Sequence, residues 1–232
     1  MECIVLAGGL GTRLQGVIGQ QPKCMAPVND LPFLSYLFRF IDRTPITRVV
    51  LSLGFQSHIV TRWLEDQFLK FELDYVVENE PLGTGGGILA AIEECETDNV
   101  VVLNGDTMFM PDLRKMMKFH VDNKSATTLA LKEMHQFDRY GVVNINAENK
   151  ITSFEEKKFQ ETGNINGGVY IINRDEFMKK PLRQKFSFEK DYLEAFVGEG
   201  NFYGFASDAY FIDIGIPQDY EKAQTDFKTL FV

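Results

Sequence analysis

The chain has 232 residues, which is long enough for one sizeable hydrophobic core and short for two independent domains. Its formal net charge of -9 argues against a nucleic-acid binder with a broad basic face. No apolar run approaches the length that crosses a bilayer, and the N-terminus lacks the basic region of a signal peptide. We therefore expect a cytoplasmic globular protein that binds neither nucleic acid nor membranes.

Strand-like and helical segments alternate along the first half of the chain. Apolar runs rich in β-branched residues predict strands at 2–7, 48–53, 73–78 and 99–106. Apolar residues at helical spacing predict helices within 31–42, 57–68, 86–95 and 111–122. This alternation, with strands that are apolar almost throughout, is typical of an α/β fold in which helices cover both faces of a mostly parallel sheet.

The second half of the chain is richer in strands. Predicted strands lie at 126–134, 141–146, 150–156, 165–173, 202–207 and 209–215. Predicted helices lie at 187–197 and 217–231, the latter with Pro217 at its start. Because no Pro/Ser-rich linker or internal repeat separates the halves, we predict one domain over 1–232, with functional halves of about 1–105 and 106–232.

The cysteines and histidines do not suggest a metal site. Cys3, Cys24 and Cys95 lie far apart and lack metal-ligand spacing, and the three histidines are scattered. We interpret the cysteines as reduced thiols without a catalytic role.

A glycine-rich segment, "AGGLGTR" (7–13), follows the first predicted strand. A tight turn and a phosphate-binding loop explain the glycines equally well, because both need closely approaching backbone. Arg13 favours polyphosphate, since a guanidinium can bind two oxygens at once. Lys23 could add a second charge, although a solvated lysine is its simpler explanation. The segment lacks both the Walker pattern and the third small residue of a dinucleotide fingerprint, which disfavours a dinucleotide-dependent oxidoreductase.

A second glycine-rich segment, "EPLGTGGGI" (80–88), follows the third predicted strand and opens a helix. Its glycines could lie close to a ligand, at a helix N-terminus that favours negative charge. The alternative is a helix start whose glycines allow close packing.

Two aspartates complete the pattern at predicted strand ends. Asp106 follows a core strand, and Asp213 lies within the apolar run "AYFIDIG" (209–215). A local turn or helix cap could explain either one singly, but together with the glycine loops and cations they predict a Mg²⁺ site. Further along, Glu156 and Lys157 lie together: the lysine could hold a substrate phosphate, although an exposed charge run is the simpler explanation. Asn166 before Gly167 could clamp sugar hydroxyls or mark a strand bulge.

In this order, these segments resemble the sugar-1-phosphate nucleotidyltransferases, also called nucleotide-sugar pyrophosphorylases. The matching segments are "LAGGLGTRL" (6–14), "PKCMAPV" (22–28), "EPLGTGGGI" (80–88), "NGD" (104–106), "YG" (140–141), "FEEK" (154–157), "NGGVY" (166–170) and "FIDIGIP" (211–217). The resemblance covers almost the whole chain. It implies a three-layer, Rossmann-like nucleotide-diphospho-sugar transferase fold with a mixed, mostly parallel central sheet.

The resemblance also implies residue roles. The nucleotide-binding residues would be Leu6, Ala7, Gly8, Gly9, Gly11, Thr12, Arg13, Gly83 and Thr84. The sugar-phosphate-binding residues would be Gly141, Glu156, Lys157 and Asn166. The catalytic residues would be Arg13, Lys23, Asp106, Lys157 and Asp213, with Mg²⁺ held by the two aspartates. The sugar phosphate is an anionic nucleophile, so the reaction needs no general base, and positioning with charge neutralisation supplies the catalysis.

The segment "LQGVIGQQPKCMAPV" (14–28) lacks the Pro-Leu-Thr of many relatives and looks more like the D-glycero-D-manno-heptose 1-phosphate guanylyltransferases, which make GDP-heptose for bacterial surface glycans. This favours GTP and a heptose 1-phosphate as partners. The alternatives are a mannose 1-phosphate guanylyltransferase, a uridylyltransferase for another sugar 1-phosphate, and a non-catalytic nucleotide-sugar-binding subunit, which loss of either aspartate would have favoured. No hexapeptide-repeat tail is present, so a fused acyltransferase is not expected, and exposed aromatic residues could serve a homo-oligomer interface.

Overall fold

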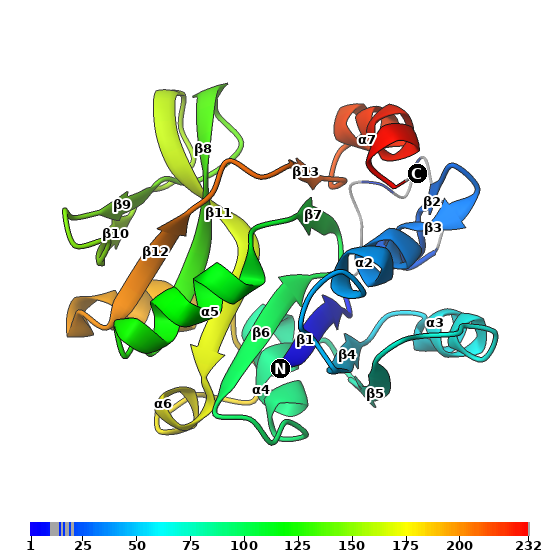
Figure 1. The fold of residues 1–232 in the computed structure, drawn as a ribbon, viewed down its shortest axis with the longest axis horizontal. Helices are drawn as coiled ribbons and strands as arrows, with labels where there is room; N and C mark the ends of the chain where they lie inside the picture. Colours follow the sequence, from blue (N-terminus) through cyan, green and yellow to red (C-terminus); the bar gives the residue numbers. More distant parts are fainter. Residues whose placement is uncertain (10–13, 15, 17–18, 20, 232) are drawn as a thin grey trace.

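A seven-stranded mixed sheet forms the centre of the computed structural model, which describes residues 1–9, 14, 16, 19 and 21–231 (Figure 1). Its strands, in spatial order, are β12 (Phe202–Ala206), β8 (Thr127–Phe137), β11 (Gln160–Asn173), β6 (Asn99–Asn104), β1 (Glu2–Ala7), β4 (Arg48–Leu53) and β5 (Glu72–Val77). Only β11 runs antiparallel to its neighbours, so the sheet is mostly parallel as predicted.

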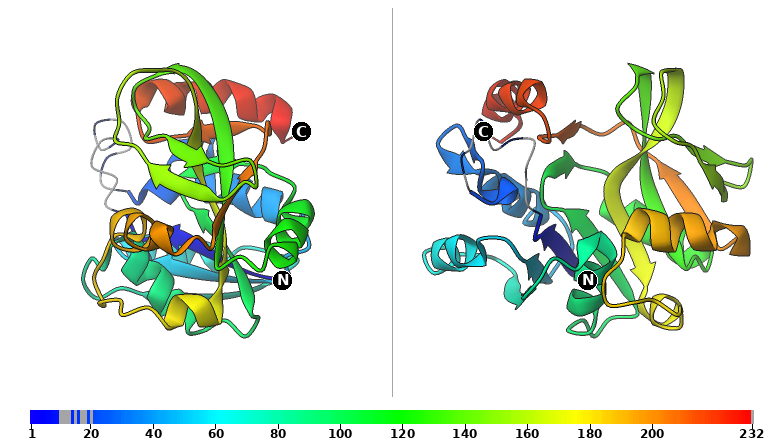
Figure 2. Two further views of the ribbon diagram at one scale, coloured as in Figure 1. Left: turned by 90° about the vertical axis from the view of Figure 1, so that its left-hand side faces the viewer. Right: turned by 180° about the vertical axis from the view of Figure 1, so that it is seen from behind.

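Helices cover both faces of the sheet (Figure 2). Alternate residues of β1 point to opposite faces, because side chains of a strand alternate. Cys3 and Val5 join the core beneath α2 (Phe33–Ile41), α5 (Leu113–Asp122) and α7 (Pro217–Leu230). Ile4 joins the core beneath α4 (Gly83–Ile92), α6 (Arg174–Met178) and the π-helix η3 (Phe188–Glu194). The predicted three-layer α/β architecture is confirmed.

The remaining elements are short. α3 (Ser57–Leu64) packs beside β5, and the 3-10 turns are η2 (Lys23–Met25) and η4 (Val197–Glu199). Three two-stranded ribbons pair β2 (Pro27–Val28) with β3 (Leu31–Pro32), β7 (Thr107–Phe109) with β13 (Phe211–Asp213), and β9 (Val143–Ile145) with β10 (Ile151–Phe154). No helix in the described part of the chain is long and apolar enough to span a membrane.

The end of β6 differs from the sequence-based prediction. The strand stops at Asn104, two residues before Asp106, because the chain turns there into β7. Gly105 allows the turn, since its N–H donates to the Leu6 carbonyl at 2.9 Å and a Cβ would lie 2.5 Å from the same oxygen. Asp106 therefore sits in a tight turn beside the end of β1.

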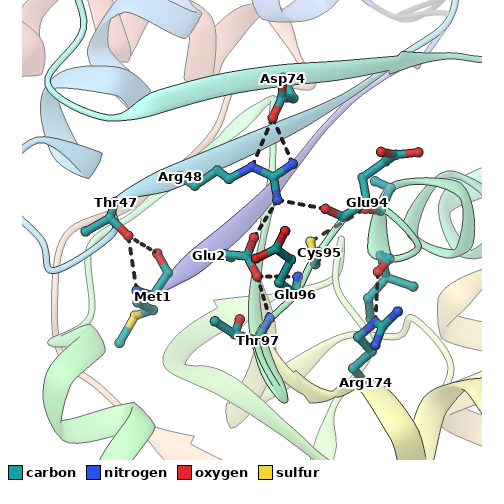
Figure 3. A network of polar contacts seen from close by, with 12 residues as sticks. Met1, Glu2, Thr47, Arg48, Asp74, Glu94, Cys95, Glu96, Thr97 and Arg174 are labelled. Carbon is teal, nitrogen blue, oxygen red and sulfur yellow. Dashed lines mark hydrogen bonds and ion pairs between the residues drawn. The ribbon is translucent and has the colours of Figure 1, made fainter.

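A polar network ties together the amino ends of β1, β4 and β5 (Figure 3). The Arg48 guanidinium lies 2.6 Å from Glu2 Oε1 and 2.8 Å from Asp74 Oδ2. Burial opposes ionisation of Glu2, but hydrogen bonds from the Thr97 backbone N–H and from Arg48 outweigh it and lower the pKa of this carboxyl. These contacts hold the strands at the edge opposite their carboxyl ends, where ligands bind in open α/β sheets.

Candidate active site

A cavity of about 430 Å³ opens at the carboxyl ends of β1, β4, β5 and β6. The residues that line it are Leu6, Ala7, Gly8, Gly9, Lys23, Cys24, Ser52, Glu78, Pro81, Gly83, Thr84, Asn104, Gly105, Asp106 and Gly215. Its walls are mostly backbone and small side chains, with charge confined to Lys23, Glu78 and Asp106. Such a slot suits a flat, partly apolar ligand that carries charge at one end.

A second, more polar cavity of about 700 Å³ adjoins the first. Its lining comes from the β9–β10 region, the β11 bulge, η3 and the segment around β13, and includes Gly141, Glu156, Lys157, Asn166 and Asp213. Lys23, Asn104 and Asp106 line both cavities. A ligand in each cavity would therefore meet the other at these three residues.

Lys23 lies between two carboxylates at this boundary. Its Nζ is 2.6 Å from Asp106 Oδ2 and 3.3 Å from Asp213 Oδ1, and its side chain is 12% exposed. The turn η2 positions Lys23, because the next two residues, Cys24 and Met25, are buried in the core. The three groups together carry one net negative charge, so the cluster can still attract a cation.

The two aspartates come together through the β7–β13 ribbon. Asp213 pairs in register with Thr107, which follows Asp106 directly. Ile214 N–H donates to the Asp106 carbonyl at 3.1 Å, and Gly215 N–H donates to Asp213 Oδ1 at 2.8 Å. Backbone contacts thus hold the two carboxylates side by side. Among the described residues, no group of three or more histidine, cysteine or acidic side chains has metal-binding geometry.

The Cys24 thiol borders the same cluster but is not activated. Burial, and then the nearby Asp106 carboxylate, raise its pKa to about 12. A protonated, buried thiol is a poor nucleophile. Cys24 therefore packs in the core beneath the cluster and is not a candidate nucleophile.

The structure brings together most of the predicted nucleotide-binding residues. Leu6, Ala7, Gly8, Gly9, Gly83 and Thr84 line the first cavity. Gly11, Thr12 and Arg13 lie outside the described residues.

The glycines at the start of α4 serve packing more than ligand approach. Gly85 and Gly86 N–H both donate to the Phe186 carbonyl, at 3.1 and 3.4 Å. A Cβ on Gly85 would lie 2.1 Å from the Phe186 ring, and one on Gly86 would lie 2.3 Å from the Gln184 carbonyl. The lack of side chains at these two positions lets the 184–188 segment pack against the helix. The alternative of close packing is therefore correct for Gly85 and Gly86. Gly83, in contrast, lines the cavity.

All four predicted sugar-phosphate residues line the second cavity. Asn166 is held firmly: its Nδ2 donates to Tyr170 Oη at 2.9 Å, and its Oδ1 accepts from Gly168 N at 3.0 Å. The β11 register shifts between Asn166 and Tyr170, and Gly168 has φ +73°, so the predicted bulge is present and forms part of the cavity wall. Glu156 and Lys157 are exposed, where an incoming ligand can reach them.

Sequence reasoning missed several charged residues in the cavity walls, among them Glu78, Arg139 and Glu189. Glu78 is the first residue after β5, and its place at a strand end was a usable signal. Arg139 precedes the quoted "YG" pair and forms an ion pair with Asp219 at 2.8 Å. Glu189 of η3 accepts a hydrogen bond from the Thr84 hydroxyl at 2.8 Å, which connects the wall of one cavity with that of the other. No local sequence pattern identifies Arg139 or Glu189 as a cavity residue, because their partners are distant in sequence.

The model of the nucleotidyl transferase family matches residues 2–229. The chain belongs to the nucleotidyl transferase family. This nucleotidyltransferase is 47% identical over 228 residues to the D-glycero-alpha-D-manno-heptose 1-phosphate guanylyltransferase of Aneurinibacillus thermoaerophilus, covering 98% of this chain and 99% of the relative. It is 42% identical over 220 residues to the enzyme of the same name from Campylobacter jejuni, with 95% and 97% covered.

A solved structure agrees with this assignment. HddC from Yersinia pseudotuberculosis, complexed with GMP-PN, superposes with a TM-score of 0.87 at 38% identity, covering 97% of this chain and 99% of that one. The chain is therefore an enzyme of the nucleotidyltransferase class, and the predicted resemblance to the sugar-1-phosphate nucleotidyltransferases is confirmed.

Proposed function

We propose that this nucleotidyltransferase transfers GMP from GTP to a heptose 1-phosphate, releases pyrophosphate, and uses Mg²⁺ bound by Asp106 and Asp213. The observation that carries the proposal is the shared boundary of the two cavities at Lys23 and Asp106. The names of the two similar enzymes and of the nucleotide in the similar structure support the choice of GTP and heptose. The reaction would take place in the cytoplasm, and its product, a GDP-heptose, would be used for surface-glycan synthesis.

The reaction is a single displacement. A phosphate oxygen of the sugar 1-phosphate, entering from the second cavity, attacks the α-phosphorus of GTP in the first. The bond from the α-phosphorus to the oxygen that bridges to the β-phosphate breaks, and pyrophosphate leaves with that oxygen. Because the nucleophile is already ionised, no side chain needs to remove a proton, and the protonated Cys24 thiol beside the cluster need not take part.

The donor set fits Mg²⁺. This ion takes oxygen ligands and keeps few protein ligands, and two carboxylates at adjacent positions match that demand. When bound, Mg²⁺ would neutralise phosphate charge and polarise the α-phosphate. Lys23 has three N–H donors, and two of them are directed to Asp106 and Asp213 in this structure, so the third can donate to a phosphate oxygen.

Two further cations would act on the phosphates. Lys157, exposed at the second cavity, is our candidate for the sugar phosphate. Arg13, by its motif, is our candidate for the triphosphate. Positive groups that meet the charge developed in the transition state are expected to supply most of the rate enhancement.

A substrate panel tests the proposal. Pyrophosphate release is measured with each of five nucleoside triphosphates against heptose, mannose and glucose 1-phosphates, with Mg²⁺ and with EDTA. We expect the highest kcat/KM for GTP with heptose 1-phosphate, and loss of activity in EDTA. A higher kcat/KM for UTP, or for mannose 1-phosphate, would contradict the corresponding half of the assignment, and full activity in EDTA would contradict the metal.

A further inference from the structure

A hydrogen bond joins the walls of the two cavities. Thr84 lies in the first turn of α4 and lines the first cavity, and Glu189 lies in η3 and lines the second. The Thr84 hydroxyl donates to Glu189 Oε2 at 2.8 Å, although the two residues are 105 positions apart in the sequence. The fold therefore links the two cavities by a polar contact before any ligand binds.

The hydrogen bonds of the Thr84 hydroxyl leave it no proton for a nucleotide. A threonine hydroxyl has one proton to donate and two lone pairs that accept. Its proton goes to Glu189, and one lone pair accepts the Phe188 N–H at 2.9 Å. Donation to a phosphate, ribose or base oxygen would break the contact with Glu189. The resemblance assigns Thr84 to the nucleotide, but these hydrogen bonds direct its side chain to η3.

The Glu189 carboxylate is held through one of its two oxygens. Oε2 accepts from the Thr84 hydroxyl at 2.8 Å and from the Ser187 hydroxyl at 3.0 Å. Oε1 accepts no hydrogen bond from the part of the chain that the structure describes, and the residue lines the second cavity. A carboxylate oxygen accepts hydrogen bonds and donates none. This oxygen therefore suits a ligand rich in hydroxyl groups.

The main chain at Glu189 is anchored by the residue before it. Phe188 is fully buried, and its ring packs edge-on against the Tyr170 ring with the centroids 5.0 Å apart. Tyr170 accepts a hydrogen bond from Asn166, which also lines the second cavity. The hydrogen bond from Thr84 then restricts the side chain of Glu189. A glutamate side chain has many rotamers, and ordering it before a ligand arrives removes that entropic cost from binding.

We propose that Thr84 is a positioning residue for the sugar, acting through Glu189, whose Oε1 accepts a hydrogen bond from a sugar hydroxyl. The inference rests on the proposed function for the placement of the sugar 1-phosphate in the second cavity. Thr84 then contributes to the affinity for the sugar phosphate, although it lines the cavity of the nucleotide. Glu189 touches the sugar and not the reacting phosphates, so it acts in recognition and not in the chemical step.

Thr84→Val keeps the shape of the side chain and removes the hydroxyl. One hydrogen bond corresponds to about three- to tenfold in affinity, so KM for the sugar 1-phosphate at saturating GTP should rise by that factor, with kcat near the wild-type value. The affinity for GTP alone, measured by titration calorimetry, should stay within about twofold of the wild-type value. Thr84→Ser keeps the hydroxyl and should retain most of the sugar affinity. Thr61→Val in α3, outside the lining of both cavities, is the matched control and should change neither value.

Glu189→Ala removes the carboxylate itself. It should raise KM for the sugar 1-phosphate by about 10- to 150-fold, because a hydrogen bond to a charged group is stronger than one between neutral groups. Adding Thr84→Val to Glu189→Ala should change this KM by less than about twofold, since Thr84 acts through the missing carboxylate. Deoxy analogues of the sugar 1-phosphate identify the hydroxyl: the analogue that lacks it should raise KM in the wild type and not in Glu189→Ala. Thermal unfolding checks that each variant is folded.

The outcomes separate this inference from the proposed function. Weaker GTP binding by Thr84→Val with an unchanged KM for the sugar phosphate overturns the positioning role, while transfer from GTP to a sugar phosphate stands. An equal effect of Thr84→Val with and without the Glu189 carboxylate overturns it as well. If no deoxy analogue distinguishes the wild type from Glu189→Ala, the contact with a sugar hydroxyl is overturned.

A preference for another triphosphate or another sugar overturns the proposed pair of substrates and not the role of Thr84. The same variants are then measured with the preferred pair, and the same ratios decide. If Glu189→Ala does not fold, the comparison of Thr84→Val with Thr84→Ser decides alone: a rise in the sugar KM for valine and not for serine supports the role, and equal values for both overturn it.

Discussion

Lys23 Nζ lies 2.6 Å from Asp106 Oδ2, and this contact stands where the two cavities of the molecule meet. A lysine that bridges two carboxylates is positioned before any ligand arrives. It therefore needs little reorganisation when a phosphate enters, which is the condition under which electrostatic catalysis is strongest.

Asp106→Asn should lower turnover by at least about 100-fold and leave the fold intact. The Asp106 carboxylate lies at the boundary of the cavities, so its substitution removes a negative charge beside the reacting phosphates. Steady-state pyrophosphate release measures the activity, and thermal unfolding measures the fold. Asp66→Asn, on an exposed turn after α3, is the matched control and should behave as the wild type. Near-normal Mg²⁺-dependent release by Asp106→Asn would contradict the assignment.

Lys157→Ala should raise KM for the sugar 1-phosphate by about tenfold and change KM for the nucleotide little. Lys157 lines the second cavity but is exposed, so its charge-assisted bond should contribute at the lower end of about 1.5–3 kcal/mol. Lys158→Ala removes a neighbouring charge that pairs with Glu155 at 2.8 Å, and it is the control. A change confined to the nucleotide KM would show that Lys157 is misplaced in our account.

Arg48→Ala should destabilise the fold by about 1–3 kcal/mol, because it leaves the buried Glu2 carboxylate with backbone donors alone. The network lies at the amino ends of the strands (Figure 3), and none of its labelled residues lines either cavity. Urea unfolding should therefore show the loss, while kcat/KM at a temperature well below the transition stays close to the wild-type value. Loss of activity without loss of stability would contradict a purely stabilising role for the Arg48 network.

His120 should make the fold sensitive to mild acid. Burial lowers its pKa to about 4, from an ordinary value of 6.5, and its ring nitrogens contact Thr128 Oγ1 and Asn99 Oδ1. The unfolded state then binds a proton that the folded state does not, so stability should fall as pH drops from about 6.5 toward 4. Unfolding free energies across this range should lose part of their pH dependence in His120→Asn. Equal slopes for wild type and variant would refute the assignment.

Local patterns predicted the elements of the sheet well, because apolar runs and helical spacing depend on neighbouring residues. The positions of Asp106 and Asp213 at predicted strand ends suggested a shared metal site. The contact between them could not be predicted, since the three-residue strands β7 and β13 that join them have no distinctive pattern. Close packing of the glycines at the start of α4 was an open alternative, but its partner Phe186 could not be named, because it lies about a hundred residues away from Gly85. Glu78 could have been predicted as a site residue from its place at a strand end. Only the glycines that follow it were interpreted as ligand-binding.

The proposed reaction requires that a sugar-phosphate oxygen attacks the α-phosphorus of GTP. Heptose 1-phosphate labelled with ¹⁸O in all its phosphate oxygens tests it, with mass spectrometry of both products. We expect every labelled oxygen to be retained in GDP-heptose and none to appear in pyrophosphate. Label in pyrophosphate, or no nucleotide sugar at all, would contradict it.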